Sequence, residues 1–218
     1  MPTNRSYGDA CGIGRALDVV GERWALLVVR ELLLGPQRFS DLRRALGNAS
    51  SNLIADRLRE LEGREVVRRR KLAPPAASWV YQLTGWGREL EPIVLALGGW
   101  GLRVPLPATP TLTVASVLIY LRSSARPDPK AAPVSIRVQL DDRVWTIRTA
   151  HGRLDIEPGE PADPDATIQT DPWSLNTLID EPDGLDAAVA DASVVVTGRL
   201  AVVRRLLRGA GSSVAAGG

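Results

Sequence analysis

Apolar residues recur three or four positions apart in the N-terminal part of the chain, which predicts a series of short helices. The first such segment, residues 12–33, is interrupted at Gly21 and is followed by Gly35, a residue typical of the position beyond a helix end. A second helix is expected over residues 39–46, with Ser40 as its N-terminal cap. The turn that follows is tight, so the pattern predicts helix, turn and helix in close succession.

The helix expected next, residues 50–61, organises this part of the chain. Ser50 can cap the free N–H groups of its first turn. Its apolar residues share one face, at Leu53, Ile54, Leu58 and Leu61. The opposite face is short and polar and contains Ser51, Asn52, Ala55, Asp56 and Arg59. A helix with such a face can lie in the major groove of DNA with its first residues at the base edges, although ordinary surface helices show the same pattern.

The pattern then changes to alternation, which predicts two strands at residues 66–71 and 79–83 with a proline-containing loop between them. The two strands form a β-hairpin, the wing of a winged helix. A run of four cations on the first strand is common on solvated surfaces, but after a candidate recognition helix it favours contact with phosphates. The predicted DNA contacts are Arg43, Arg44, Ser50, Ser51, Asn52, Arg59, Arg68, Arg69, Arg70 and Lys71.

A further helix follows Thr84, which is placed to cap it. From Gly87 to Trp100 this helix carries more apolar surface than a small winged domain needs. The pattern therefore predicts that it joins two copies of the chain into a homodimer, together with the N-terminal helix; the alternative is that it packs on its own domain. The expected dimer contacts are Leu90, Ile93, Val94, Leu97 and Trp100.

Two domains are expected, and the first spans residues 1–103. Residues 104–110 contain three prolines and no charge, so they are expected to form a semi-rigid linker. Residues 111–209 combine helical periodicity with alternation, which predicts an α+β domain with a five-stranded sheet and covering helices. The expected strands are residues 134–140, 143–148, 153–156, 166–170 and 193–197. Residues 210–218 offer little to bury and are expected to be disordered.

The two expected domains also differ in net charge. Residues 1–104 carry 16 Lys and Arg and 11 Asp and Glu, a net charge of +5. Residues 105–218 carry 11 Lys and Arg and 14 Asp and Glu, a net charge of −3. A basic first half joined to an acidic second half is typical of a nucleic-acid-binding module fused to a domain that does not contact phosphate.

The sequence argues against several other classes of protein. One cysteine, Cys11, and one histidine, His151, exclude an intrachain disulfide and a zinc site of Cys and His within one chain. We find no constellation of catalytic residues, and we expect no cofactor and no enzyme activity. Residues 1–10 are polar and no apolar run is long enough to span a membrane, so a cytoplasmic protein without a signal peptide or membrane contact is expected.

Several segments of residues 11–101 occur in the order of a known family. They are CGIGRALDVVGERWALLVVRELLLG, RFSDLRRALG, SSNLIADRLRELE, the pair Pro74 and Pro75, and YQLTGWGREL. In these segments the chain resembles the HxlR family of bacterial winged-helix transcription regulators, which implies a homodimer that binds operator DNA with inverted half-sites. Glu65 departs from the family pattern, which usually has glycine there, so the corner after the recognition helix is expected to be built around Gly63.

The second domain resembles another family through two short motifs. Residues 165–168, DATI, and residues 194–198, VVVTG, resemble a strand-to-helix turn and an ending of the sterol-carrier-protein-like fold. This resemblance implies a five-stranded sheet backed by helices, with an apolar cavity for lipids or other hydrophobic molecules. Alternation and helix phase direct apolar side chains toward the sheet, with simple core packing as the alternative. The expected ligand contacts are Val117, Leu118, Leu121, Trp145, Trp173, Leu175, Leu178 and Ile179.

The sequence thus predicts a dimeric transcription repressor whose DNA binding is controlled by a hydrophobic small molecule in the second domain. In one alternative, Cys11 senses oxidants or electrophiles, as the HxlR resemblance implies for part of that family, and the second domain only dimerises. The place of Cys11 before a helix N-terminus favours a thiolate, although the other interpretation is that Cys11 is a small buried residue. In a second alternative the protein carries hydrophobic ligands, but the basic wing argues against it.

Overall fold

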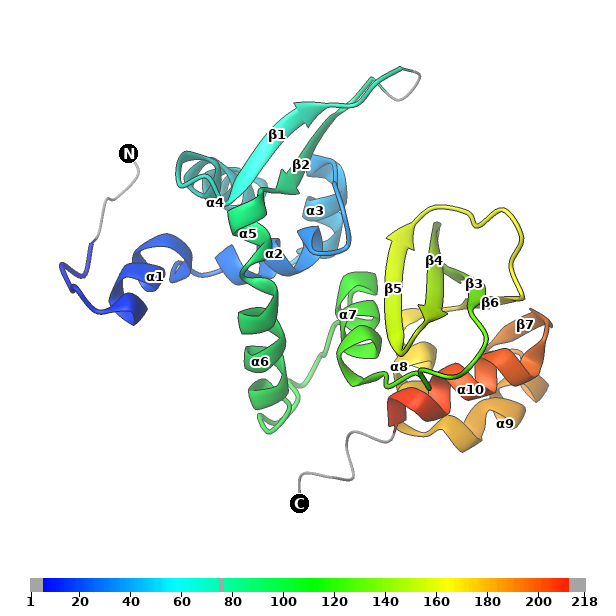
Figure 1. The fold of residues 1–218 in the computed structure, drawn as a ribbon. Coiled ribbons are helices and arrows are strands. Elements are labelled where there is room, and N and C mark those ends of the chain that lie inside the picture. The colour runs from blue at the N-terminus through cyan, green and yellow to red at the C-terminus, as the bar shows by residue number, and fades with distance from the viewer. Residues whose placement is uncertain (1–5, 75–76, 212–218) are drawn as a thin grey trace. The chain divides into compact units, whose positions relative to one another are not determined.

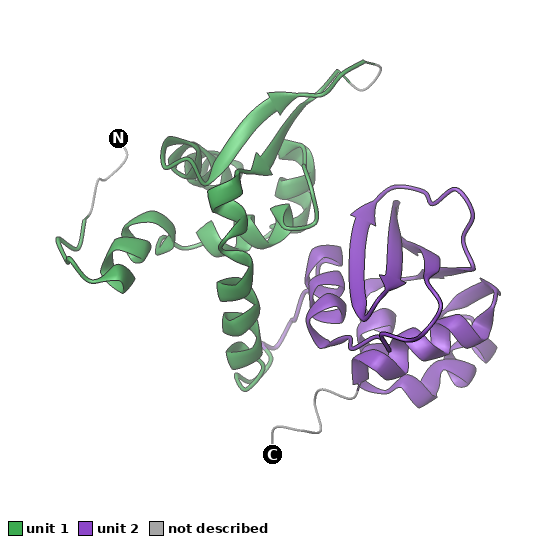
Figure 2. Cartoon of the chain, viewed as in Figure 1, with its two compact units in different colours: residues 1–106 green, residues 107–218 purple. Residues whose placement is uncertain are grey.

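The computed structural model describes residues 6–74 and 77–211 of the 218-residue chain. The chain divides into two compact units, residues 1–106 and 107–218, which we call unit 1 and unit 2 (Figure 2). Unit 1 contains a two-stranded hairpin, and unit 2 contains a five-stranded sheet. The fold is therefore mixed α+β, as the sequence predicts.

Unit 1 is helical apart from its hairpin, and the hairpin projects from the helices as a wing (Figure 1). Its elements are α1 (Gly12–Val20), α2 (Ala25–Leu32), α3 (Phe39–Ala45), α4 (Ser51–Gly63), β1 (Val67–Lys71), β2 (Trp79–Leu83), α5 (Gly85–Arg88) and α6 (Glu91–Gly101). The order of helices α3 and α4 followed by a hairpin is that of a winged helix-turn-helix. The interruption expected at Gly21 is confirmed, since α1 ends at Val20.

Two details of unit 1 differ from the sequence prediction. Ser40 is not the cap of α3, because the helix begins at Phe39 and its cap position is Arg38, whose N–H donates to the Asp41 carboxylate at 3.2 Å. The single helix expected after Thr84 is divided into α5 and α6. Thr84 does cap α5, since its hydroxyl accepts from the Gly87 N–H at 3.0 Å.

The corner between α4 and β1 is built on Glu65 rather than on Gly63. Glu65 has a φ of 58°, in the left-handed region, whereas Gly63 is the last residue of α4. The Val66 N–H donates to the Leu61 carbonyl at 2.9 Å, and the Glu65 N–H donates to the Glu62 carbonyl at 3.0 Å. This pair of bonds is a Schellman motif, which places a left-handed residue at the position after the helix cap. The expectation for Gly63 is therefore wrong.

The base of the wing is fixed to the helices by backbone contacts. Gln37 pairs with Tyr81 through two backbone hydrogen bonds, with the Gln37 N–H donating at 2.9 Å and the Tyr81 N–H donating at 2.8 Å. On the other side of the base, a Cβ added to Gly87 would lie 2.1 Å from the Val66 carbonyl oxygen. Only glycine allows α5 to approach the residue before β1 this closely.

Unit 2 has helices before, between and after the strands of its sheet (Figure 1). Its elements are α7 (Val114–Ser124), β3 (Val134–Leu140), β4 (Arg143–Ala150), β5 (Arg153–Pro158), β6 (Ala166–Thr170), α8 (Pro172–Asp180), the 3-10 helix η1 (Pro182–Gly184), α9 (Leu185–Ala190), β7 (Val195–Gly198) and α10 (Leu200–Gly211). The strand order is β5-β4-β3-β6-β7, with β3 and β6 parallel and the other pairs antiparallel. The expected five-stranded sheet is present.

Alternation along the strands decides which side chains form the core of unit 2. Alternate residues of β3, beginning with Val134, are buried, and the residues between them are half-buried. The last strand starts at Val195 rather than at residue 193, and the last helix continues through residues 210 and 211, which were expected to be disordered. Residues 212–218 of that expected tail lie outside the described residues.

Candidate nucleic-acid interface

Helix α4 presents its first turn to solvent. The Ser50 hydroxyl accepts from the Leu53 N–H at 3.3 Å, so the cap predicted from the sequence is confirmed. Ile54 is buried on the inner face of the helix, whereas Ser51 and Asn52 are exposed on the outer face. The capped start of the helix therefore projects two polar side chains that can donate or accept hydrogen bonds.

Two arginines of α4 have different roles. Arg57 is largely buried and forms ion pairs with Glu60 and, at 3.6 Å, with Glu22, so it ties α4 to the segment before α2. Arg59 is exposed and pairs with Asp56 at 2.7 Å, one helical turn before it. Exposed ion pairs of this kind contribute little, about 0.3–0.5 kcal/mol, so Arg59 can exchange its carboxylate for a phosphate.

Positive charge surrounds α4 on the neighbouring elements. Arg43 and Arg44 are exposed at the end of α3. The four cations predicted to contact phosphates are all exposed on β1: Arg68, Arg69, Arg70 and Lys71. The hairpin register pairs Arg69 with Tyr81 and Arg70 with Val80. All the predicted DNA-contact side chains thus lie at the surface of unit 1, which leaves them accessible to a phosphate backbone.

Two of the wing arginines are held by uncharged side chains. The Arg70 guanidinium donates to the Gln82 side-chain oxygen, and Gln82 is buried. The Arg69 guanidinium lies over the Trp79 ring, 4.5 Å from its centroid, and 6.0 Å from the Tyr81 centroid. Sequence reasoning missed these partners, because the register of the hairpin decides which cation meets which ring.

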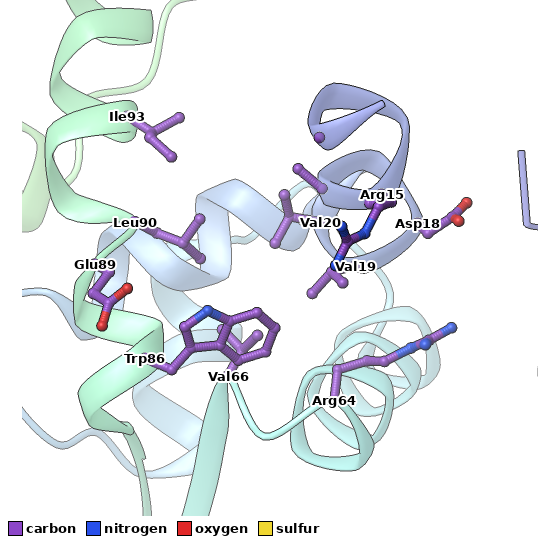
Figure 3. Close-up of a pocket in the computed structure, with 12 residues that line it drawn as sticks. Arg15, Asp18, Val19, Val20, Arg64, Val66, Trp86, Glu89, Leu90 and Ile93 are labelled. Carbon is purple, nitrogen blue, oxygen red and sulfur yellow. The ribbon is translucent and has the colours of Figure 1, made fainter. Parts of the chain in front are cut away.

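Helix α6 and helix α1 border an apolar groove of about 690 Å3 in unit 1. In Figure 3, Trp86, Leu90 and Ile93 face Val19 and Val20 across it, while the carboxylates of Asp18 and Glu89 point away. No residue of α6 is buried within the unit. Among the expected dimer contacts, Leu90 and Val94 are half-buried, and the exposed ones are Ile93, Leu97 and Trp100.

The segment before α1 is held by one carboxylate. Asp18 accepts from the Tyr7 N–H and from the Ser6 hydroxyl, both at 2.8 Å, and the Tyr7 bond is the main cause that lowers the pKa of the Asp18 carboxyl. Cys11 stands at the N-terminal cap of α1, where its N–H donates to Asp9 at 2.8 Å and its side chain is exposed. The thiol is therefore at the surface rather than in the core.

The side chains expected to line a ligand cavity in unit 2 lie in its core, with one exception. Trp145 is 1% exposed, whereas Trp173 is 42% exposed in the first turn of α8. The expectation that Trp173 points inward is wrong, because the inward stripe of α8 is formed by Leu175, Leu178 and Ile179 at helical spacing. The Trp145 Nε1 atom is buried without a hydrogen-bond partner.

Within residues 6–74 and 77–211, no three or more His, Cys, Asp or Glu side chains are grouped so that they could hold a metal ion. In the same residues no helix has the length and hydropathy needed to cross a membrane.

The comparisons with known proteins point to unit 1. A family model described as HxlR-like helix-turn-helix matches residues 19–106. The uncharacterized HTH-type transcriptional regulator YvaP of Bacillus subtilis (strain 168) is 38% identical over 86 residues, which cover 39% of this chain and 80% of YvaP. The HTH-type transcriptional regulator YodB of the same organism is 32% identical over 85 residues, which cover 39% of this chain and 76% of YodB.

The solved structures give matches of similar extent. A structure described as the redox regulator HypR in its oxidized form is 33% identical, covers 44% of this chain and 98% of HypR, and has a TM-score of 0.41.

Proposed function

The chain belongs to the HxlR-like helix-turn-helix family, and we propose that it is a homodimeric transcription repressor whose DNA binding is controlled by a hydrophobic small molecule in unit 2. The observation that carries the DNA-binding part is the surface of unit 1, where the polar first turn of α4 and the cations of the wing are exposed together. In this proposal α4 enters the major groove, with Ser51 and Asn52 at base edges. The wing contacts phosphates, which fix the orientation of the protein on the duplex.

The recognition role of α4 is tested with DNA from the chain's own promoter region. Asn52→Ala is expected to change which sequences bind, because an amide that reads a base edge discriminates by about 1–3 kcal/mol. Asn176→Ala is the matched control, since Asn176 lies on α8 in unit 2 and bonds to Asp180 at 3.0 Å. Binding selected from a randomised pool measures the preference. Identical preferences for Asn52→Ala and wild type would contradict the docking.

The homodimer is supported by apolar surface that unit 1 leaves uncovered. Helix α6 is apolar along most of its length, and an apolar helix of this kind is normally buried. Exposed Ile13 and Leu17 add to this surface on α1. We propose that a second copy of the chain covers α1, α6 and the groove between them, which places two recognition helices on inverted half-sites.

Control by a ligand rests on unit 2. We propose for it the sterol-carrier-protein-like fold, which is supported by the five-stranded sheet and by the contact between its two motifs. A Cβ on Gly198 would lie 2.8 Å from the Asp165 carbonyl oxygen, so glycine is needed where the motifs meet. The unpartnered Trp145 N–H gives a buried polar atom that a ligand oxygen could satisfy. The proposed effector binds among Val117, Leu118, Leu121, Trp145, Leu175, Leu178 and Ile179, with Trp173 at the margin.

Native mass spectrometry of protein taken directly from its source tests the ligand proposal. The expected result is a dimer mass that carries a co-purifying apolar molecule. That molecule must then release DNA over the concentration range in which it binds, because a ligand with equal affinity for both forms shifts nothing. A protein that carries no molecule, and binds DNA with the same affinity after extraction with organic solvent, would contradict this part of the proposal.

The exposed thiol of Cys11 favours one rival, in which the sensor is chemical rather than a bound ligand. In that case hydrogen peroxide or a quinone releases wild-type protein from DNA and leaves the Cys11→Ser variant bound. Our proposal expects the same DNA affinity for both proteins before and after treatment.

A further inference from the structure

The wing carries an aromatic platform, formed by Trp79 and Tyr81, beneath one of its four cations. In the antiparallel register Arg69 is opposite Tyr81, and the neighbouring pair is Lys71 and Trp79. Because side chains alternate along strands, all four project from the same face of the hairpin. The Arg69 guanidinium reaches diagonally to the Trp79 ring, 4.5 Å from its centroid. This distance is within the roughly 6 Å range of a cation–π contact.

The outer end of this face, at Lys71 and Trp79, is exposed to solvent, whereas its base is covered, since Val67 and Leu83 are 1% and 2% exposed. Trp79 is 50% exposed, whereas Val80 and Gln82, which project from the other face, are 2% and 8% exposed. Tyr81 lies nearer the base and is half-buried, so Trp79 is the more open ring of the platform. The Trp79 ring is therefore available to hold a neighbouring cation in place rather than to fill the core.

Another arginine–tryptophan contact, in unit 2, involves a ring that is buried rather than exposed. In unit 2, Arg143 lies 4.9 Å from the centroid of Trp145, but that ring is 1% exposed and belongs to the core. On the wing the Trp79 ring is exposed, and it contacts the Arg69 guanidinium. Trp79 is thus not part of a core, as Trp145 is.

Stacking on a ring fixes a guanidinium without neutralising it. A carboxylate partner would compensate the charge of Arg69, whereas an aromatic face leaves the full charge and the N–H groups at the edge of the planar fork available. A long flexible side chain normally loses rotamer freedom when it binds, and a side chain already held in place loses less. A pre-oriented Arg69 therefore binds an anion more tightly than a mobile one.

We propose that Trp79 and Tyr81 position Arg69 to contact a backbone phosphate of operator DNA, so that part of the wing contact is organised before binding. Trp79 is a positioning residue, and Arg69 makes the contact. This inference rests on the proposed DNA binding, and it adds two residues that the charge pattern alone does not select. It requires that the stacked form of Arg69 be the form that binds.

Four variants of the full chain test the inference on one promoter fragment, with the dissociation constant measured across a range of salt concentrations. Trp79→Ala is expected to weaken binding about two- to fivefold, the population effect of losing an exposed cation–π contact. Its salt dependence stays that of wild type, because no charge is removed. Arg69→Ala is expected to reduce the magnitude of the log–log salt slope by about 0.9, the value for one lost phosphate contact. Trp79→Phe keeps an aromatic face and should bind within twofold of wild type.

The double variant Arg69→Ala/Trp79→Ala separates positioning from direct contact. The expected result is that it binds like Arg69→Ala alone, since the platform acts only through Arg69. A further loss in the double variant, or wild-type affinity for Trp79→Ala, would overturn the inference. An unchanged unfolding temperature for Trp79→Ala shows that the hairpin is intact, and Trp79→Phe provides the same control by rescue. If wild type itself does not bind DNA with a salt dependence, the proposed function fails, and the inference fails with it.

Discussion

The wing of unit 1 and the whole of unit 2 use arginine in different ways. In unit 2, five arginines pair with carboxylates of the same unit, as Arg137–Glu160, Arg148–Glu157, Arg199–Asp165, Arg204–Asp186 and Arg208–Asp183. On the wing of unit 1, Arg70 is held by Gln82 and Arg69 by aromatic rings. Carboxylates compensate the charge that they hold, whereas amides and rings leave it in place. Position in the fold, and not the number of arginines, thus decides which unit presents positive charge to a partner.

The same contrast holds for apolar helices. Helix α10 of unit 2 buries an apolar stripe that includes Val203 and Leu207 in its own core. Helix α6 of unit 1 is more apolar on average, yet none of its residues is buried. A helix that is apolar on several faces is stable in water only when something covers it. Unit 2 therefore buries the apolar stripe of α10 in its own core. In our proposal, a second copy of the chain covers α6.

The largest effect is expected from a charge placed on α6. Leu97→Glu would bury an unpaired carboxylate at the dimer contact, which costs several kcal/mol. Sedimentation velocity at micromolar concentration should show a monomer for this variant and a dimer for wild type. Val195→Glu in unit 2 is the matched control, because Leu97 and Val195 are both 47% exposed. A monomeric wild type, or a dimeric Leu97→Glu variant, would show that α6 is not the contact.

The next largest effect concerns the base of the wing. Gly87→Ala would place a Cβ 2.1 Å from the Val66 carbonyl oxygen, a backbone atom that cannot rotate away as a side chain could. We expect a loss of about 2–3 kcal/mol in the free energy of unfolding of unit 1, the range for overpacking. Gly98→Ala on α6 meets nothing within 4 Å and should be neutral or stabilising. Calorimetry should show that Gly87→Ala lowers only the transition of unit 1; equal midpoints for the two variants would refute the close approach.

Acid is expected to lower the stability of unit 2 through two of its carboxylates. The Ser135 N–H, followed by Arg199, lowers the pKa of Asp165, and the hydrogen bond from Arg137 lowers the pKa of Glu160. Because the folded values are lower than the unfolded ones, this stabilisation is complete above the ordinary carboxyl pKa of about 4. It is lost as the pH falls through that value and then through the folded pKa.

The measurement is calorimetry from pH 7 to pH 3, with the unit 1 transition identified by Gly87→Ala. Asp165→Asn should destabilise unit 2 at pH 7 and flatten its dependence on pH below 4. Asp18→Asn is the control, because Asp18 bonds to Ser6 and Tyr7 in unit 1 and should leave the transition of unit 2 unchanged. A pH dependence of unit 2 that is the same with and without Asp165 would contradict the assignment.

A smaller effect is expected at the corner between α4 and the wing. Glu65 adopts a φ of 58°, which glycine tolerates better than a residue with a Cβ. Glu65→Gly should therefore stabilise unit 1 by about 1 kcal/mol. The same substitution at Glu62, inside α4, should destabilise it by about 0.5–1 kcal/mol. Thermal unfolding measures whether each variant gains or loses stability. A loss of stability for both variants would show that the left-handed corner is not strained.

Local signals in the sequence were sufficient for most of the elements. Periodicity predicted the helices and alternation predicted the strands, and Ser50 and Thr84 cap helices where a capping residue was expected. These features depend on neighbours a few residues apart, so a single sequence carries them. Both the five-stranded sheet and the winged helix-turn-helix follow from the order of those elements.

Features that depend on contacts between distant segments could not be predicted. The left-handed corner at Glu65 depends on how β1 must leave α4, and the orientation of Trp173 depends on the phase at which α8 meets the sheet. The contact of Arg69 with Trp79 depends on the register of the hairpin. The predicted DNA and dimer contacts are all at the surface, apart from half-buried Leu90 and Val94, and their partners remain predictions.

The salt dependence of DNA binding by two arginine variants tests the difference between the units most directly. Arg69→Ala removes a wing cation held by rings, and Arg148→Ala removes an exposed cation paired with Glu157 at 2.7 Å in unit 2. Both change the net charge by the same amount. Our account predicts that Arg69→Ala reduces the magnitude of the log–log salt slope by about 0.9 while Arg148→Ala leaves it unchanged. Equal slopes for the two variants would contradict the account, because DNA would then respond to net charge rather than to the wing.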